Sequence, residues 1–193
     1  MLTTTLKEKT CAQCGTQFRP FSSTSRVCSQ ICALRWVRVE KKKERALDRK
    51  KKQDQMPIRE LLAEVQVPFN AWIRARDADL PCVSCGVVNP PMTTGGQWDA
   101  GHFLSRGAYP ELRFNEDNVA KQCKSCNAGS GKFAHKERTV SQRFEEELRR
   151  RIGDERVDAL KCAHPLHKWE RDELIAIKAD FVQRLKQLKG ATK

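Results

Sequence analysis

The stretch that decides the fold begins with Cys82-Val-Ser-Cys85 and closes with Cys123-Lys-Ser-Cys126. Each pair separates two cysteines by two residues, which is the spacing that lets two thiolates hold one Zn²⁺ from a tight turn. Four cysteines complete a tetrahedral site, so this zinc would be structural and would leave no position for a substrate. The spacing therefore predicts that any chemistry comes from the residues around and between the pairs.

The histidine and asparagines around these pairs follow a recognisable order. His102 is the only histidine between the pairs, Asn118 precedes Cys123 by five residues, and Asn127 directly follows Cys126. A zinc-bound hairpin with a histidine base, followed by a helix with a metal ligand, is the order of the HNH, or ββα-metal, nucleases. The predicted fold is α+β: a small zinc-stapled ββα-metal (HNH-like) nuclease core flanked by helices, with an N-terminal zinc knuckle.

The HNH order gives each of these residues an expected role. His102 would accept a proton from an attacking water. Asn118 would fasten a long loop by hydrogen bonds to the backbone and so align His102. Asn127, at the start of the helix behind the second pair, would offer its amide oxygen to a catalytic Mg²⁺ or Mn²⁺. Asparagine also serves in turns and caps, so only the offsets from the cysteines support these catalytic roles.

The first ligand of the catalytic cation is left open by the sequence. Many HNH nucleases place an acid or a second histidine directly before the base, whereas this chain has Gly101. Asp99 is the nearest carboxylate, but strand alternation does not bring it beside His102 automatically. We prefer Asp99 for this role, with His135 downstream as the alternative.

A second four-cysteine set lies near the N-terminus. The pairs Cys11/Cys14 and Cys28/Cys32 flank thirteen residues that suit a zinc knuckle turning into a short hairpin. So small a unit buries little apolar surface, and metal binding would supply most of its folding free energy. With the first set, this predicts two structural zinc ions and leaves Cys162 as an unpaired thiol.

The net charge of +13 is concentrated in the N-terminal part of the chain, where residues 1–56 hold 14 Lys and Arg against 5 Asp and Glu. The segment 33–55 lacks Gly and Pro, and its apolar residues are too sparse for a packed face, which predicts an exposed basic helix that ends before Pro57. We expect it to bind nucleic acid, or else to be merely solvated, in which case Arg149–Arg151 would be the alternative surface. The predicted DNA-binding residues are Arg35, Arg38, Lys41, Lys42, Lys43, Arg45, Arg49, Lys50, Lys51 and Lys52.

Composition excludes two classes of protein. Nine cysteines without an apolar leader, eight of them in close pairs, favour zinc in a reducing cytoplasm over a secreted disulfide framework. No apolar run approaches ~18–20 residues, so no membrane partner is expected.

The expected organisation has four parts, with a knuckle at 1–32, a basic helix at 33–56, a nuclease core at 57–138 and a helical region at 139–193. Pro68 is expected to break the helical region 58–79 in two. A final helix from about Glu170 to Lys189 carries an apolar stripe, which is expected to face the core rather than a partner.

Several short blocks resemble one known family. They are Trp98-Asp-Ala-Gly-His102, Leu112-Arg-Phe-Asn-Glu116, Lys121-Gln-Cys123 and the tail from His167-Lys-Trp169 to Ala176-Ile-Lys-Ala179. In this order they resemble the NinG (Rap) proteins of lambda-like bacteriophages over essentially the whole chain. The resemblance implies a phage recombination endonuclease that cuts displacement loops and Holliday junctions in the cytoplasm of the bacterial host. It also implies branched or single-strand-containing DNA, and phage or host recombination proteins, as partners.

Two other interpretations remain open at this point. One is a non-catalytic zinc-dependent DNA-binding or annealing factor, since Gly101 replaces the usual ligand. The other is an HNH endonuclease that selects sequence. Symmetric cutting of a four-way junction needs two active sites, which makes a homodimer attractive.

Overall fold

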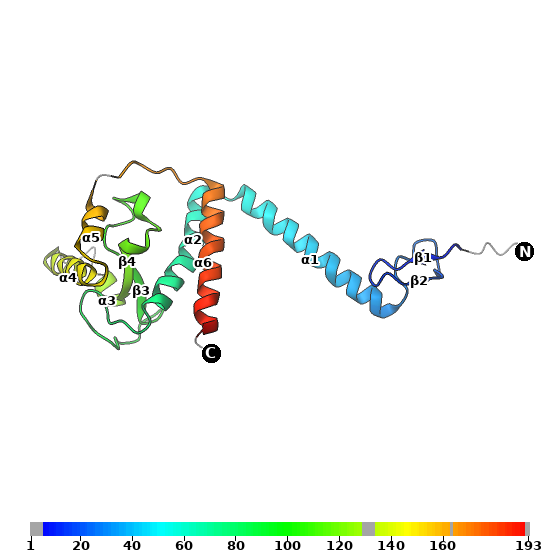
Figure 1. Cartoon of the computed structure of the whole chain (residues 1–193), viewed down its shortest axis with the longest axis horizontal. Helices are drawn as coiled ribbons and strands as arrows, with labels where there is room; N and C mark the ends of the chain where they lie inside the picture. Colours follow the sequence, from blue (N-terminus) through cyan, green and yellow to red (C-terminus); the bar gives the residue numbers. More distant parts are fainter. Residues whose placement is uncertain (1–5, 129–133, 163, 192–193) are drawn as a thin grey trace, which may run out of the picture. The chain divides into compact units, whose positions relative to one another are not determined.

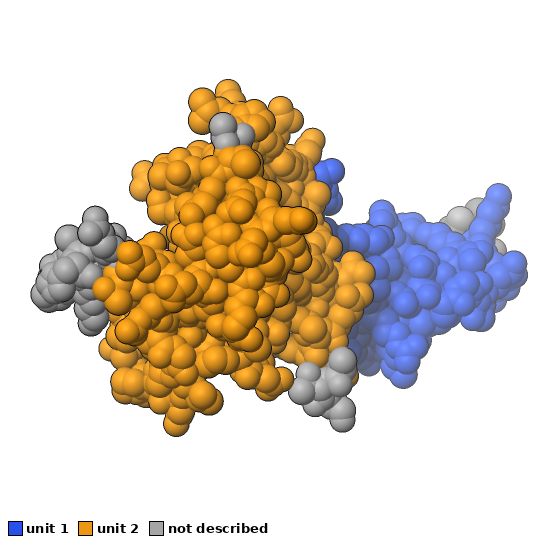
Figure 2. All heavy atoms as spheres, turned by 60° about the vertical axis from the view of Figure 1, so that its left-hand side comes forward, with its two compact units in different colours: residues 1–56 blue, residues 57–193 orange. Residues whose placement is uncertain are grey.

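The computed structural model describes residues 6–128, 134–162 and 164–191, with only the backbone of residues 134–138. The chain divides into two compact units, residues 1–56 and residues 57–193 (Figure 2). Within the described residues, no helix is long and apolar enough to cross a lipid bilayer.

The first unit is a small hairpin followed by a long helix. Strands β1 (Lys9–Thr10) and β2 (Gln17–Phe18) pair antiparallel. Helix α1 (Gln30–Gln55) begins after Ser29, whose side chain accepts a hydrogen bond from the Cys32 backbone N–H. Met56 and Pro57 end the helix, as the sequence predicted.

The second unit opens with α2 (Ile58–Arg76), which runs through Pro68 without a break. The prediction that Pro68 divides this helix is wrong. A proline removes one N–H from the helix ladder, a loss of about 3 kcal/mol or more when nothing offsets it. Here the flanking turns bury Val65, Phe69 and Trp72 against the rest of the unit, and this burial outweighs the defect.

The central element is the antiparallel pair β3 (Trp98–His102) and β4 (Val119–Cys123). Trp98 lies opposite Cys123 and His102 lies opposite Val119, so the cysteine end and the histidine end of the hairpin are opposite ends of the same ladder. Two short 3₁₀ turns lie in the connection, η1 (Pro110–Leu112) and η2 (Glu116–Asn118). A four-residue helix, α3 (Lys124–Asn127), follows β4 directly.

Helices cover both sides of this hairpin (Figure 1). On one side α2 packs with α6 (Arg171–Ala191), where the Phe69 ring lies 4.8 Å from Phe181 and 5.5 Å from Phe114. Leu174 and Phe181 are buried there, so the apolar stripe of the last helix serves the core, as predicted.

The other side is covered by α4 (Ala134–Ile152) and α5 (Asp154–Lys161). Ala120 of β4 joins a core cluster with residues of both helices and of the preceding loops, namely Val83, Leu112, Phe144, Leu148, Val157 and Leu160. The mixed helix-and-sheet composition confirms the α+β class.

The aromatic cluster around Phe69 gives the first prediction. Phe69→Ala should lower the free energy of unfolding of the second unit by about 3–5 kcal/mol, because the ring is completely buried and leaves a cavity. Urea unfolding followed by circular dichroism measures this change. Val67→Ala, two residues away on a side chain that is 69% exposed, is the control and should change little. Equal losses for both variants would contradict the packing described.

Candidate metal centres and active site

The two cysteine knuckles share one backbone geometry. The Cys82 N–H donates to the Val87 carbonyl at 2.9 Å, and the Gly86 N–H donates to the Cys82 carbonyl at 2.9 Å. The equivalent two hydrogen bonds close the turn after Cys11 at the same lengths. Gly86 and Gly15 hold φ values of +71° and +77°, which glycine adopts without strain. Both turns therefore hold their cysteines in the same way, with the first buried and the second exposed.

The sulfur positions fit a tetrahedral zinc in each unit. The Cys14–Cys28 and Cys28–Cys32 sulfurs lie 3.6 Å apart, and the Cys85–Cys123 sulfurs lie 3.7 Å apart. A Zn–S bond of ~2.3 Å in a tetrahedron separates neighbouring sulfurs by about 3.8 Å. The predicted sets each come together, with all four sulfurs within 4.8 Å of one another: Cys11, Cys14, Cys28 and Cys32, and Cys82, Cys85, Cys123 and Cys126. Each cluster could hold a zinc ion.

The thiols of the second cluster differ in acidity. Burial raises the pKa of Cys123, but the Ser125 hydroxyl and the Cys126 backbone N–H favour the thiolate more strongly and bring this pKa to about 7. Burial and a hydrogen bond with the Cys123 side chain raise the pKa of the Cys126 thiol. A bound cation would stabilise all four thiolates, so zinc binding should release protons.

The clusters give the second prediction. The full chain should hold two tightly bound zinc ions after a wash with a weak chelator. Cys82→Ser and Cys123→Ser should each lower the zinc content to one and unfold the second unit, because the cluster ties the knuckle to the end of β4. Cys11→Ser should also lose one zinc but should leave the second unit folded, since each unit has its own cluster.

Cys162→Ser is the matched control for these variants. Its exposed thiol lies 3.4 Å from the Asp158 carbonyl and outside both clusters. Metal analysis should find two zinc ions in this variant. Fewer than two zinc ions per wild-type chain would show that one of the two cysteine clusters does not bind zinc.

His102 ends β3 with its ring partly buried. Its Nε2 lies 3.0 Å from the Arg113 carbonyl oxygen, which can only accept, so Nε2 carries the hydrogen. Burial lowers the pKa of His102, the Arg113 carbonyl offsets part of this effect, and the positive charges of Arg106 and Arg113 lower it further, to about 4. The ring is therefore neutral near pH 7, with Nδ1 as a proton acceptor.

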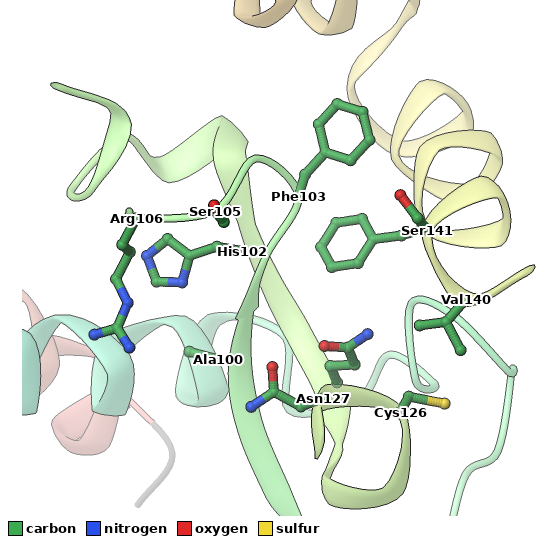
Figure 3. Close-up of a pocket in the computed structure, with 11 residues that line it drawn as sticks. Ala100, His102, Phe103, Ser105, Arg106, Cys126, Asn127, Val140 and Ser141 are labelled. Atoms are coloured by element: carbon green, nitrogen blue, oxygen red, sulfur yellow. The ribbon is translucent and has the colours of Figure 1, made fainter. Parts of the chain in front are cut away.

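A pocket of about 310 Å³ lies beside β3 and is also lined by Gln122 of β4. His102 and Arg106 line it on one side of the strand, and Asn127 lines it on the other (Figure 3). Phe103 and Phe144, whose ring centres are 5.8 Å apart, form an apolar wall. The structure thus brings two of the predicted site residues, His102 and Asn127, to one pocket.

Asp99 does not line this pocket, but it is hydrogen-bonded to Asn127, which does. Lys124 donates from Nζ to its Oδ1 at 2.9 Å, and Asn127 donates from Nδ2 to its Oδ2 at 2.9 Å. Burial raises the pKa of Asp99, but Lys124 and Asn127 together hold it below its usual range. Asp99 precedes His102 by three positions along β3, which places them on opposite faces of the strand. A divalent cation at this carboxylate would have to compete with the Lys124 ammonium.

The remaining predicted residues are placed as follows. Asn127 ends the short α3 instead of starting the next helix, which begins at Ala134, so that detail of the prediction is wrong. The reason is that α3 stops after one turn. His135 lies in the first turn of α4, and its side chain is outside the described residues.

Asn118 is completely buried at the end of η2. Its Oδ1 accepts from the Leu104 N–H at 2.8 Å, and its Nδ2 donates to the carbonyls of Leu104 and Leu112 at 3.0 and 3.2 Å. These bonds fasten the loop that follows His102, as expected from the sequence. Its contribution to catalysis stays a prediction.

Comparison with known proteins covers nearly the full chain. A family profile described as "Bacteriophage Lambda NinG protein" matches residues 3–191. The chain belongs to the NinG family. It is 36% identical to protein ninG of Escherichia phage lambda and 35% identical to protein ninG of Salmonella phage P22, in each case over 93% of this chain, and it covers 91% and 92% of those relatives. Protein ninG of Escherichia phage 933W is 40% identical over 72% of this chain and 67% of its own length. No solved structure matches the chain.

The space beside Gly101 in this NinG chain was not predicted from the sequence. A Cβ atom built on Gly101 would lie 2.2 Å from Gln122 Oε1. Gln122 is buried, and its Nε2 donates to the Ser84 hydroxyl of the knuckle at 2.7 Å. Position 101 therefore excludes a side chain because Gln122 fills the space, and the sequence shows the glycine but not its partner.

This contact gives the third prediction. Gly101→Ala should destabilise the NinG chain by about 1–3 kcal/mol, since a methyl group there forces Gln122 from its bond to Ser84. Gly107→Ala is the control, because no atom lies within 4 Å of the added methyl and φ there is not positive. Adding Gln122→Ala to Gly101→Ala should recover part of the loss in a double-mutant cycle measured by urea unfolding. Additive effects would show that the two positions are not coupled.

Proposed function

We propose that this NinG protein is a metal-dependent, structure-selective DNA endonuclease that cleaves branched recombination intermediates. The observation that carries the proposal is the state of His102. The ring is neutral, its Nε2 is held by the Arg113 carbonyl, and it lines a pocket that Asn127 also lines. The order of β3, β4 and α3, closed at one end by the cysteine cluster, is compatible with a ββα-metal (HNH-like) core.

In this proposal His102 accepts a proton at Nδ1 from the attacking water, a role for which a neutral imidazole near pH 7 is suited. Asn118 keeps the loop after β3 in place and so holds the ring toward the pocket. The Arg113 carbonyl fixes the tautomer and stabilises the ring when it becomes charged. A bound Mg²⁺ or Mn²⁺ would hold the phosphate and stabilise the leaving oxygen.

The residues that would hold this cation are only partly suited to it. Asn127 donates through Nδ2 to Asp99, which leaves its Oδ1 as the hard oxygen for Mg²⁺ or Mn²⁺. Asp99 offers a second oxygen ligand, but Lys124 already neutralises its charge. Asn127 is therefore the better supported ligand, with Asp99 second and His135 as the alternative.

The DNA-binding surface proposed is α1. Cys32 is the only one of its residues that the structure records as buried, and the ion pair described within it is Lys43 with Glu40. By contrast, Arg149 pairs with Glu145, Asp154 and Asp158, and both Arg150 and Arg151 pair with Glu147. The alternative surface at Arg149–Arg151 is thus largely neutralised by its own carboxylates. Contacts from exposed lysines and arginines to phosphate favour recognition of shape over sequence.

A second candidate function is a non-catalytic zinc-dependent DNA-binding or annealing factor. Two observations favour it, the closed space at Gly101 and the Lys124 ammonium on Asp99. It predicts binding of branched DNA without any need for His102 or a divalent cation.

A sequence-selecting HNH endonuclease would instead cut linear duplex as well as a fork or junction. Action as a homodimer, with recombination proteins, in the cytoplasm of the phage host belongs to the same proposal.

The fourth prediction tests the enzyme. Wild-type protein should cut labelled four-way and three-way DNA in the presence of Mg²⁺ or Mn²⁺, should cut linear duplex less, and should cut nothing in EDTA. His102→Ala should lower the cleavage rate by ~10²–10⁴ while junction binding stays nearly intact, because a general base is lost and no DNA-binding residue is removed. Gel assays of cleavage and of binding measure the two effects.

His164→Ala is the matched control for His102→Ala. Its Nε2 also lies near a carbonyl, that of Leu160 at 3.1 Å, but it does not line the pocket. The control should cleave at the wild-type rate. Wild-type cleavage by His102→Ala would place the proton acceptor elsewhere, and binding without cleavage by the wild-type protein would favour the annealing factor.

The fifth prediction concerns α1. Log affinity for duplex falls by ~0.9 per log unit of salt for each phosphate neutralised. If about four cations of α1 contact DNA, replacing Lys41, Lys42, Lys43, Lys50, Lys51 and Lys52 by Gln should flatten the salt dependence by roughly two to four units. Fluorescence anisotropy over a salt series measures the slope. Arg150, Arg156 and Lys161, which are ion-paired cations outside α1, can be replaced by Gln as the control and should leave it nearly unchanged. An unchanged slope in the α1 variant would mean that the helix is only solvated.

A further inference from the structure

Two arginines beside His102 converge on one neutral oxygen. Arg106 donates from Nη1 to Gln66 Oε1 at 3.3 Å, and Arg113 donates from Nε to the same oxygen at 3.1 Å. Gln66 comes from α2 and is only 6% exposed, and its own amide donates to Asn70 at 2.7 Å. The amide is therefore held from both ends, and it holds the two guanidinium groups close together.

This pair of positive charges has no counter-charge within the described part of the chain. No carboxylate there lies within ion-pair distance of Arg106 or Arg113, whereas Arg184 on α6 pairs with Glu116. Burial and the positive charge of Arg106 both lower the pKa of Arg113, as expected where two like charges lie close together. A neutral amide can orient two cations without neutralising either of them.

The pair lies at the site already described. Arg106 lines the pocket with His102, and the carbonyl of Arg113 is the group that fixes the His102 ring. Figure 3 shows the Arg106 side chain alongside the His102 ring. An anion held by these guanidinium groups would therefore lie next to the proton acceptor.

We propose that Arg106 and Arg113 form a clamp for a backbone phosphate of the DNA strand at His102, and that Gln66 is the positioning residue that holds the two guanidinium groups side by side. The proposal rests on the proposed nuclease function and adds the group that binds the reacting strand. A guanidinium presents several N–H donors in a planar fork that matches the oxygens of a phosphate, which a neutral amide or a lysine does not do.

Binding of inorganic phosphate to the zinc-loaded full chain tests the clamp without DNA, added Mg²⁺ or Mn²⁺, or catalysis. The probe is the His102 imidazole signal in NMR spectra at pH 7, assigned by its loss in His102→Gln. The wild-type signal should shift saturably as phosphate is added. Gln66→Glu should weaken this binding at least tenfold, because the new carboxylate occupies and neutralises both guanidinium groups.

Further variants separate the clamp from a role in folding. Arg106→Gln should weaken phosphate binding at least tenfold with little change in thermal unfolding, since Arg106 is exposed. If Gln66→Glu does not fold, Gln66→Met serves in its place and should also weaken phosphate binding, by loss of orientation. Arg59→Gln, an exposed arginine on the same helix, is the matched control and should bind phosphate as the wild type does.

The cleavage assay adds a second readout. Arg106→Gln should lower kcat on junction DNA by about 10²–10³ with a smaller change in KM, and Arg106→Lys should recover only part of the loss. The absence of a saturable phosphate shift at His102, or equal shifts in wild type and Arg106→Gln, would overturn the clamp even if the protein cleaves DNA. A saturable shift that requires Arg106, in a protein that cuts no DNA, would support the anion site and refute the nuclease function.

Discussion

The cysteine cluster of the second unit is the constraint on which the described site depends. It joins a knuckle at Cys82 to the end of β4 at Cys123, and Cys123 lies opposite Trp98 in the ladder. A two-stranded sheet has marginal stability alone in water, and a slip of one residue would turn every side chain to the other face. Fixing one end of the ladder therefore fixes which residues of β3 face α2 and which face α4. The cysteine cluster at one end of the hairpin therefore determines the position of His102 at the other end.

The candidate site combines a neutral base with unneutralised cations. Several arginines of this unit, Arg149 and Arg184 among them, form ion pairs with carboxylates. Arg106 and Arg113 instead donate hydrogen bonds to the amide oxygen of Gln66. Their positive charges lower the pKa of the neighbouring His102 imidazole. This local excess of positive charge is unfavourable for the free protein and favourable for an incoming anion. Binding of the proposed phosphate would relieve this unfavourable interaction.

Whether a feature could be predicted from the sequence depends on how far apart its residues lie along the chain. Cysteine spacing reports local turns, so both clusters could be placed, and the fastening role of Asn118 followed from its offset to Cys123. Gln66 bonds Arg106 and Arg113 across 40 and 47 residues, and no spacing rule connects such positions. The continuity of α2 through Pro68 depends on burial by elements that are distant in the sequence. Local helix propensity does not include such tertiary contacts. The end of α3 at Asn127 depends on where one turn of helix stops, a boundary that sequence patterns define poorly.

The contact between Gly101 and Gln122 also bears on how a protein of this kind can change over generations. The amide of Gln122 occupies the place of a side chain at position 101 and is tied to Ser84 on the knuckle. An acidic residue could enter position 101 without a clash only after Gln122 had first become smaller, and that first step would leave Ser84 without its partner. Either order therefore begins with a destabilising step, so the path to a carboxylate beside His102 is narrow. Charged groups at the candidate site are thereby supplied more readily from positions other than 101.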